Sequence, residues 1–233
     1  MSLWSRLADL VSAVVARGEG LLALFDRPPE RPERSVAFTI AIVCLGAKMA
    51  KVDGVVKPVE VAAFRRIFHI APEDEAAAAR VYNLARQDAG GFEVYAGRIA
   101  RLFRRQPRTL EDILEGLFHI ALADGCYNEV EGSFLRRVAE IFGLSAARFA
   151  AIEARLAPCA KRDPWQVLGA PHDADLETIR ARWRKLVREN HPDKMIARGL
   201  PPEGVALASA RLAAINAAWE EISALLAPPA PAR

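Results

Sequence analysis

A helix–turn–helix pattern occurs twice in this chain and restricts the choice of folds more than any other feature. AKVDGVVKPVEVAAFRRIF begins at Ala50, and ALADGCYNEVEGSFLRRVAEIF begins at Ala121. Each copy has an apolar stretch, an Asp-Gly turn and then apolar residues spaced as on one side of a helix. Aromatic residues make up only 7% of the chain, which favours helices over strands. We therefore expect an all-α fold that contains an internal repeat.

Changes in composition divide the 233 residues into successive segments. Proline and charge are concentrated in RPPERPER and again near the C-terminus, where helices cannot continue. Between the two repeats, further helical stretches are expected near 73–88 and 92–106. The predicted segments are an N-terminal amphipathic helix with a Pro-rich hinge (1–34), a helical bundle with the repeat (35–157), a linker (158–162), a second helical module (163–227) and a disordered tail (228–233).

Charge and cysteine content narrow the classes of partner and compartment. A net charge of +3 is too small for nucleic-acid binding across the whole surface, so an electrostatic partner must be met by a local patch. Cys44, Cys126 and Cys159 lie far apart without a CxxC pair, which argues against a disulfide framework and a structural zinc site. The longest apolar run, VAFTIAIVCLGA, is about half the ~20 residues of a membrane span. We expect a cytoplasmic protein without a transmembrane segment.

The N-terminal segment permits two interpretations. Its apolar residues follow helical spacing and form a one-sided stripe, which consists of Leu3, Trp4, Leu7, Leu10, Val11, Val14 and Val15. Packing of this stripe on the following bundle is the preferred interpretation. The alternative is attachment of residues 1–25 to a membrane surface, which would place the protein peripherally at the inner membrane.

Acidic residues of the repeats are candidates either for helix capping or for a divalent metal site. The candidates are Asp53, Glu60, Asp124 and Glu131. Their spacing does not match an EF-hand loop. In NEVE, Asn128 and Glu131 have the spacing of a capping box, and in KPVE, Pro58 and Glu60 suit the first helical turn. Capping is therefore preferred, no cofactor is predicted, and metal binding stays as the alternative.

The duplicated pattern resembles the tellurite-resistance TerB-like domain over about residues 35–157. The resemblance implies a helical bundle. Members of that family are proposed to bind metal through acidic residues of this kind, which would concern the four carboxylates of the two repeats.

Downstream of the linker, two helices with complementary apolar stripes predict an antiparallel hairpin. They are expected at about 175–190 and 204–226, with Trp165 and Leu168 of a short preceding helix closing the small core. His191-Pro192-Asp193 follows the first of these helices and should lie at the tip of the hairpin. Beside it, an exposed stripe of cations is expected at Arg180, Arg184, Lys185 and Arg188.

A catalytic or zinc-binding role for His191 and Asp193 lacks the further residues it would need. No Ser or Cys nucleophile lies in this loop, and the other histidines show no ligand spacing. Pro192 fixes the loop backbone so that the side chains on either side project in defined directions. This arrangement favours recognition of another protein over chemistry, and the chain is not expected to be an enzyme.

DPWQVLGA, LETIRARWRKLVRENHPDKM and INAAWEEI occur in order and resemble a J-domain, the module with which Hsp40 co-chaperones bind Hsp70. With a preceding TerB-like domain, the whole is similar to bacterial DnaJ-like proteins of the DjlA type. The resemblance implies that a DnaK-type Hsp70 contacts the basic stripe and His191-Pro192-Asp193, followed by Lys194, and that Asp193 triggers ATP hydrolysis in that partner.

Two residues depart from the family pattern. Trp183 replaces a Tyr and should be tolerated as a large aromatic side chain, whereas Asn190 replaces an aromatic or apolar residue and is expected to loosen the loop. We therefore predict a co-chaperone that stimulates an Hsp70. The alternative is a metal- or stress-sensing TerB-like module that its J-domain tethers to Hsp70. The client and the oligomeric state stay open.

Overall fold

The computed structural model describes residues 3–17, 20–26, 31–53, 70–87, 90–123, 128–156 and 163–226. Within these ranges the regular elements are helices, which confirms the predicted all-α class. They are α1 (Leu3–Ala16), η1 (Leu21–Phe25), α2 (Arg31–Asp53), η2 (Pro72–Asp74), α4 (Glu75–Gln87), α5 (Phe92–Leu102), α6 (Pro107–Ala121), α7 (Glu129–Ile141), α8 (Ala146–Leu156), α9 (Pro164–Leu168), α10 (Leu176–Glu189), α11 (Pro192–Ala197) and α12 (Pro202–Leu225).

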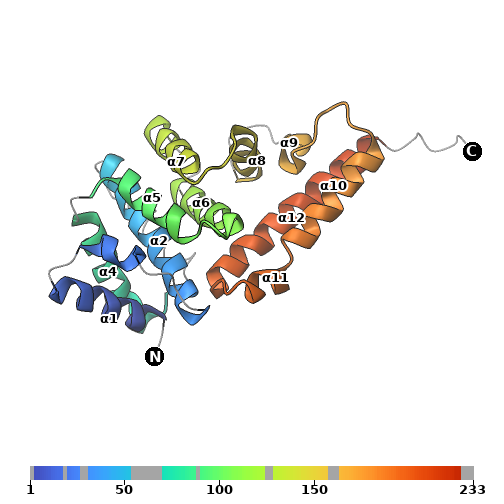
Figure 1. The fold of residues 1–233 in the computed structure, drawn as a ribbon. Helices are drawn as coiled ribbons and strands as arrows, with labels where there is room; N and C mark the ends of the chain where they lie inside the picture. Colours follow the sequence, from blue (N-terminus) through green and yellow to red (C-terminus); the bar gives the residue numbers. More distant parts are fainter. Residues whose placement is uncertain are drawn as a thin grey trace, which may run out of the picture.

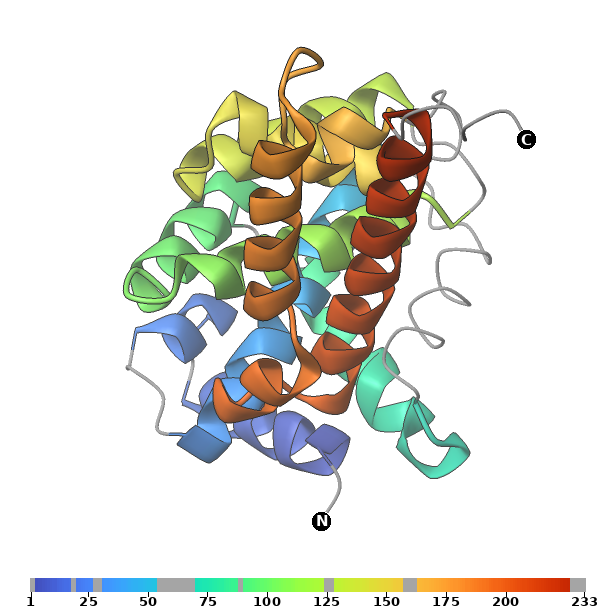
Figure 2. The same cartoon turned by 90° about the vertical axis from the view of Figure 1, so that its right-hand side faces the viewer.

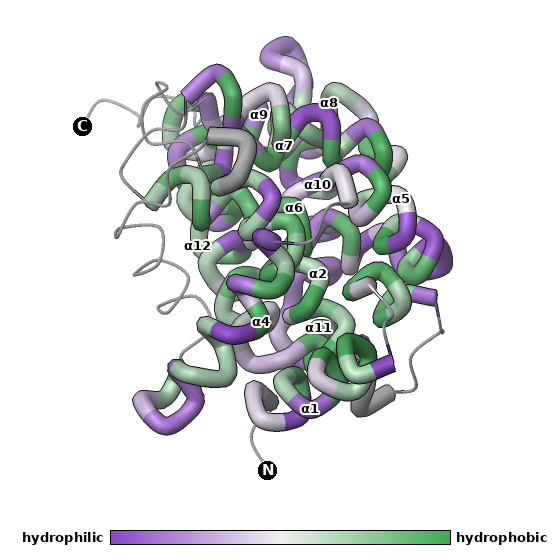
Figure 3. Tube along the Cα trace, turned by 90° about the vertical axis from the view of Figure 1, so that its left-hand side faces the viewer, coloured by the Kyte–Doolittle hydropathy of each residue, from purple (hydrophilic) through white to green (hydrophobic). Residues whose placement is uncertain are grey.

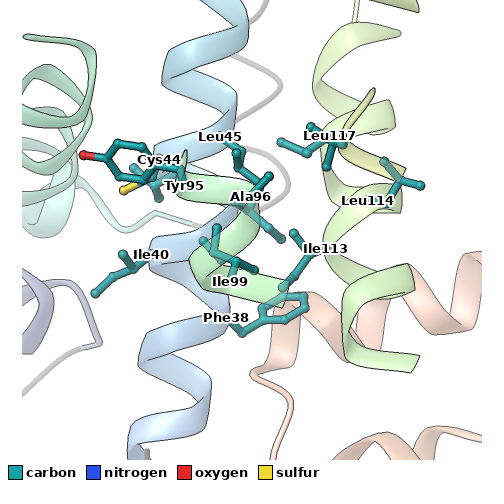
Figure 4. Close-up of a cluster of buried hydrophobic side chains, with 14 of the residues drawn as sticks. Phe38, Ile40, Cys44, Leu45, Tyr95, Ala96, Ile99, Ile113, Leu114 and Leu117 are labelled. Atoms are coloured by element: carbon teal, nitrogen blue, oxygen red, sulfur yellow. The ribbon is translucent and has the colours of Figure 1, made fainter. Parts of the chain in front are cut away.

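Helix α2 runs through the middle of the N-terminal bundle, with α4, α5 and α6 around it (Figure 1). Its apolar run is buried on nearly every side, as expected for a helix that is hydrophobic all round. Figure 4 shows Phe38 and Leu45 of α2 packing with Ile99 of α5 and with Ile113 and Leu117 of α6. The predicted helices near 73–88 and 92–106 are confirmed as α4 and α5.

The apolar stripe of α1 packs on this bundle. Trp4, Leu7 and Val11 are buried in the same core as α2 and α4, and Val14 is buried as well. This confirms packing, the preferred interpretation of the N-terminal stripe, because these side chains are already covered by protein. The hinge is shorter than predicted, since α2 begins at Arg31 and includes the last part of RPPERPER. Proline has no backbone N–H, but the N–H groups of the first helical turn have no partner within the helix in any case. Pro32 is therefore compatible with a helix that begins at Arg31.

The C-terminal module is the predicted hairpin. Figure 2 shows α10 and α12 running antiparallel side by side, with α11 at one end of the pair. Asp163 caps α9 by accepting a hydrogen bond from the Trp165 N–H, and Gly169 ends that helix in the left-handed conformation, with φ 62°. Leu168, Ile179 and Ile222 are buried in a core that belongs to this module.

The two parts of the chain share buried apolar surface. Met195, Leu200 and Ala208 come from α11, the connection after it and α12, yet they are buried in the core of the N-terminal bundle.

Figure 3 shows hydrophobic stretches along α2 and α6 and hydrophilic ones near the periphery of the molecule. Among the described helices, none combines the length and apolar character that crossing a bilayer requires.

The packing of α1 predicts a sharp difference between two leucines of the same helix. Leu7 is 0% exposed and Leu10 is 43% exposed. We expect Leu7→Ala to lower the free energy of unfolding by about 2–5 kcal/mol, because it leaves a cavity in the core. Leu10→Ala should cost less than about 1 kcal/mol. Urea unfolding followed by circular dichroism measures both, and equal losses would contradict this packing of α1.

Candidate functional site

Helix α10 is positioned by its cap and by two stacked tryptophans. The carboxylate of Asp175 accepts a hydrogen bond of 2.7 Å from the Thr178 N–H, which satisfies one of the unpaired donors at the helix start. The indole of Trp183 stacks on that of Trp219 with ring centroids 5.0 Å apart. Its Nε1–H donates to Oδ1 of Asn216 at 3.0 Å. The expectation that Trp183 would be tolerated in this core is therefore confirmed.

The predicted cationic stripe lies on the outer side of α10. Its four members, Arg180, Arg184, Lys185 and Arg188, are all exposed. The guanidinium carbon of Arg180 lies 5.7 Å from the ring centroid of Trp219, which restrains this side chain over the hairpin. The stripe leads along α10 toward the loop that carries the His-Pro-Asp sequence.

His191, Pro192 and Asp193 form the start of the short helix α11. The imidazole Nδ1 of His191 accepts a hydrogen bond of 3.3 Å from the Asp193 N–H and so caps the helix, while Pro192 occupies the first helical position. The side chain of Asp193 is 85% exposed and that of His191 is 52% exposed. Lys194 is exposed as well. The structure therefore places the predicted recognition residues in adjacent segments of α10 and α11, all of them exposed except Pro192, which is half-buried.

Asn190 does not loosen this loop, contrary to our expectation. It is buried, its amide Nδ2 donates to the Leu186 carbonyl at 2.7 Å, and its Oδ1 accepts from Nη1 of Arg211 at 2.8 Å. An apolar residue could make neither bond. The departure from the family pattern thus exchanges apolar packing for a hydrogen-bonded anchor immediately before the signature.

Arg211 connects this anchor to a pair of buried acids on α6. Its Nη2 donates to Oδ1 of Asp112 at 2.6 Å, and its Nε donates to Oε2 of Glu115 at 2.7 Å. Asp112 also accepts from Arg198 at 2.5 Å, and Glu115 also accepts from Arg155 at 2.7 Å. Each buried charge therefore meets counter-charges through hydrogen bonds, which is the condition for keeping ions inside a protein.

Proximity of opposite charges outweighs burial in setting the pKa values of Glu115 and Arg211. Burial alone would raise the pKa of Glu115, but Arg211 and Arg155 hold it below its ordinary value of 4.5. Burial would lower the pKa of Arg211, but Glu115 and Asp112 hold it above its ordinary value. Glu115 and Arg211 are therefore both ionised at neutral pH.

This network was missed in the sequence, although one signal for it is present. PRTLEDILEGLFHIA places Asp112 and Glu115 three residues apart among apolar residues, so both would enter a core if the helix is buried. Because acidic side chains are rarely buried without a partner, this spacing predicts that a basic side chain from elsewhere in the protein pairs with them. The spacing within α6 gives no means of identifying Arg211, which lies 99 positions from Asp112.

Of the acidic repeat residues, Glu131 can be assessed. Its carboxylate accepts from the Asn128 N–H at 2.8 Å, while Oδ1 of Asn128 accepts from the Glu131 N–H at 2.9 Å. This confirms the predicted capping box. Glu60 and Asp124 lie outside the described residues, and Asp53 is described only as the end of α2. Metal binding at the four predicted acids therefore stays a prediction.

Comparison with known proteins gives matches to both parts of the predicted architecture. The family described as tellurite resistance protein TerB matches residues 39–154, inside the bundle predicted for 35–157. Similar proteins include three named Co-chaperone protein DjlA: that of Photobacterium profundum is 24% identical over 237 residues, that of Escherichia coli K12 is 32% identical over 133 residues, and that of Aliivibrio fischeri is 44% identical over 61 residues. No solved structure matches the chain significantly.

These matches differ in extent. The Photobacterium match covers 89% of this chain and 84% of the relative. The Escherichia match covers 47% of this chain and 49% of the relative, and the Aliivibrio match covers 26% of this chain and 22% of the relative. The chain thus spans less than half of the length of two of these relatives, while the likeness to the first extends over nearly all of the chain.

Removing the cation at the centre of the network should destabilise the whole chain. Arg211→Met keeps a long side chain but leaves Asp112 and Glu115 short of positive charge. We expect it to lower the free energy of unfolding by about 3–5 kcal/mol, as for other broken buried ion pairs. Arg137→Ala breaks an exposed pair with Glu140 and should cost less than about 1 kcal/mol. Urea unfolding measures both, and a similar small loss in both variants would contradict a structural role for the network.

Stability should fall in acid because of Glu115. Its pKa in the folded protein lies below the ordinary value of 4.5, so its contribution is complete above that pH and is lost as the pH falls through the lower, folded value. Glu115→Gln cannot titrate. The stability difference between the two proteins should therefore shrink between about pH 5 and about pH 3. Urea midpoints across this range test the expectation, and a constant difference would refute it.

Proposed function

We propose that this chain, a DnaJ-like protein of the DjlA type in which a TerB-like domain precedes a J-domain, binds a DnaK-type Hsp70 and stimulates its ATP hydrolysis. The relatives are named co-chaperones. The observation that carries the proposal is the joint exposure of Asp193, His191 and the cationic stripe beside a fixed loop. Such a surface can meet a folded partner without prior rearrangement.

The role proposed for this surface is recognition. The stripe of α10 offers positive charges that would attract an acidic surface on the Hsp70, and such attraction raises the rate of encounter and weakens with salt. Asp193 projects a carboxylate beyond the stripe and is open to a cationic or hydrogen-bonding group of the partner. Bond breaking would take place in the ATP site of the Hsp70, so the chain itself needs no nucleophile. The encounter is expected in the reducing cytoplasm, which suits the dispersed cysteines.

Substitution of one exposed carboxylate tests this proposal. We expect the wild-type protein to stimulate single-turnover ATP hydrolysis by a bacterial DnaK, and Asp193→Asn to lose that stimulation by at least about tenfold, because its charge is removed at the contact. Raising the salt concentration should increase the amount of wild-type protein needed for half-maximal stimulation.

Asp173→Asn is the matched control. Asp173 is an exposed aspartate in the loop between α9 and α10, at the opposite end of the hairpin from α11 (Figure 2). The control should stimulate like the wild type, and both variants should unfold like it. Absence of stimulation by the folded wild-type protein, or equal losses in the two variants, would overturn the proposed function.

A further inference from the structure

The signature loop is held from both sides by the other domain. Before it, Glu189 accepts a hydrogen bond from Nη2 of Arg108 at the start of α6. Asn190 accepts from Arg211 of α12, which is itself hydrogen-bonded to α6. After it, Arg198 donates to Asp112 of α6 at 2.5 Å. Met195 is 0% exposed and lies in the core of the N-terminal bundle. His191, Asp193 and Lys194 are thus exposed in a short segment between two anchored ends.

These anchors converge on one helix of the TerB-like domain. Asp112 and Glu115 hold Arg211 in place, and Arg211 in turn holds the side-chain oxygen of Asn190. Asp112 also binds Arg198 on the far side of the loop. Asp112 of α6 therefore supports both ends of the signature. It binds Arg198 after the signature directly, and it supports Asn190 before the signature through Arg211.

The contact supports the loop without covering it. The side chain of Asp193 stays 85% exposed in the docked arrangement, and the cationic residues of α10 stay exposed too. A contact that blocked partner binding would bury these groups. The N-terminal bundle therefore contacts the side of α11 and α12 that is buried, and leaves the side with the predicted recognition residues open.

We propose that α6 of the TerB-like domain fixes the orientation of the His-Pro-Asp loop, with Arg211 and Asn190 as positioning residues that do not themselves touch the partner. This inference deepens the proposed function and rests on it for its effect on Hsp70. Holding the loop before the encounter removes ordering that binding would otherwise require, so that more of the protein is competent to bind at any moment. The TerB-like domain then acts as part of the recognition module.

Asn190→Ala is the selective test in the full chain, since it cuts the link to the loop and leaves Arg211 bonded to both acids of α6. We expect amide hydrogen exchange of residues 191–197 to become faster in the free protein. The concentration for half-maximal stimulation of DnaK should rise about tenfold, while the maximal rate is kept, because fewer molecules hold a competent loop. Exchange elsewhere should change little, and the urea midpoint should fall less than in Arg211→Met, because Arg211 keeps its bonds to both carboxylates of α6.

Arg211→Lys cuts the same link from the other side, because a single ammonium group cannot keep all three of the contacts that the guanidinium makes. If both residues act through one bridge, the double variant should show the loop exchange and half-maximal concentration of the more affected single variant, not the sum of the two effects. Arg137→Ala, which breaks an exposed pair on α7, should leave both measurements unchanged.

Exchange and stimulation distinguish a failure of this inference from a failure of the proposed function. Unchanged loop exchange and unchanged half-maximal concentration in Asn190→Ala would overturn the positioning role, even if Asp193→Asn abolishes stimulation. A fall in the maximal rate without faster exchange would also overturn it, because it would indicate contact with the partner. If the wild-type protein does not stimulate DnaK, the proposed function fails, and loop exchange alone decides whether α6 orders the loop.

Discussion

Asp112 and Glu115 are two buried acidic side chains of α6, and both need basic side chains as partners inside the protein. Burial of an unpaired carboxylate costs more than a small domain can tolerate, so these acids impose a condition on the rest of the fold. Arg211 satisfies it with hydrogen bonds to both. Because that arginine comes from α12, the helical bundle cannot complete its own electrostatics without the C-terminal hairpin.

The same pairing of charges also holds the residues on either side of the His-Pro-Asp loop. Arg211 reaches past the two acids to Asn190, and Arg198 returns to Asp112 from the other side of the loop. Met195 and Leu200 add apolar contacts to the bundle core. A J-domain is easily pictured as a module that moves freely on a linker. In this chain the tip of the hairpin instead packs on the neighbouring domain, and the side chains of His191 and Asp193 stay exposed there.

Much of the fold and part of the site could be predicted from local patterns. Apolar spacing predicted the helices and the packing of α1, and the hairpin followed from the matching stripes of α10 and α12. Asn128 and Glu131 predicted a capping box that the structure contains. Asn190 misled the prediction, because its effect depends on a partner that is distant in sequence. The hinge was predicted too long, because proline is compatible with the first turn of α2.

The sequence by itself determined the helical class, the order of the helices in the described residues and the exposure of His191 and Asp193. These properties depend on spacing within one or two helical turns, which the chain displays directly. Only the tertiary structure decided that Asp112 meets Arg211, 99 positions away, and that the signature rests on α6. The physical reason is that the pairing of distant buried charges depends on how whole helices pack, and no local pattern contains that geometry.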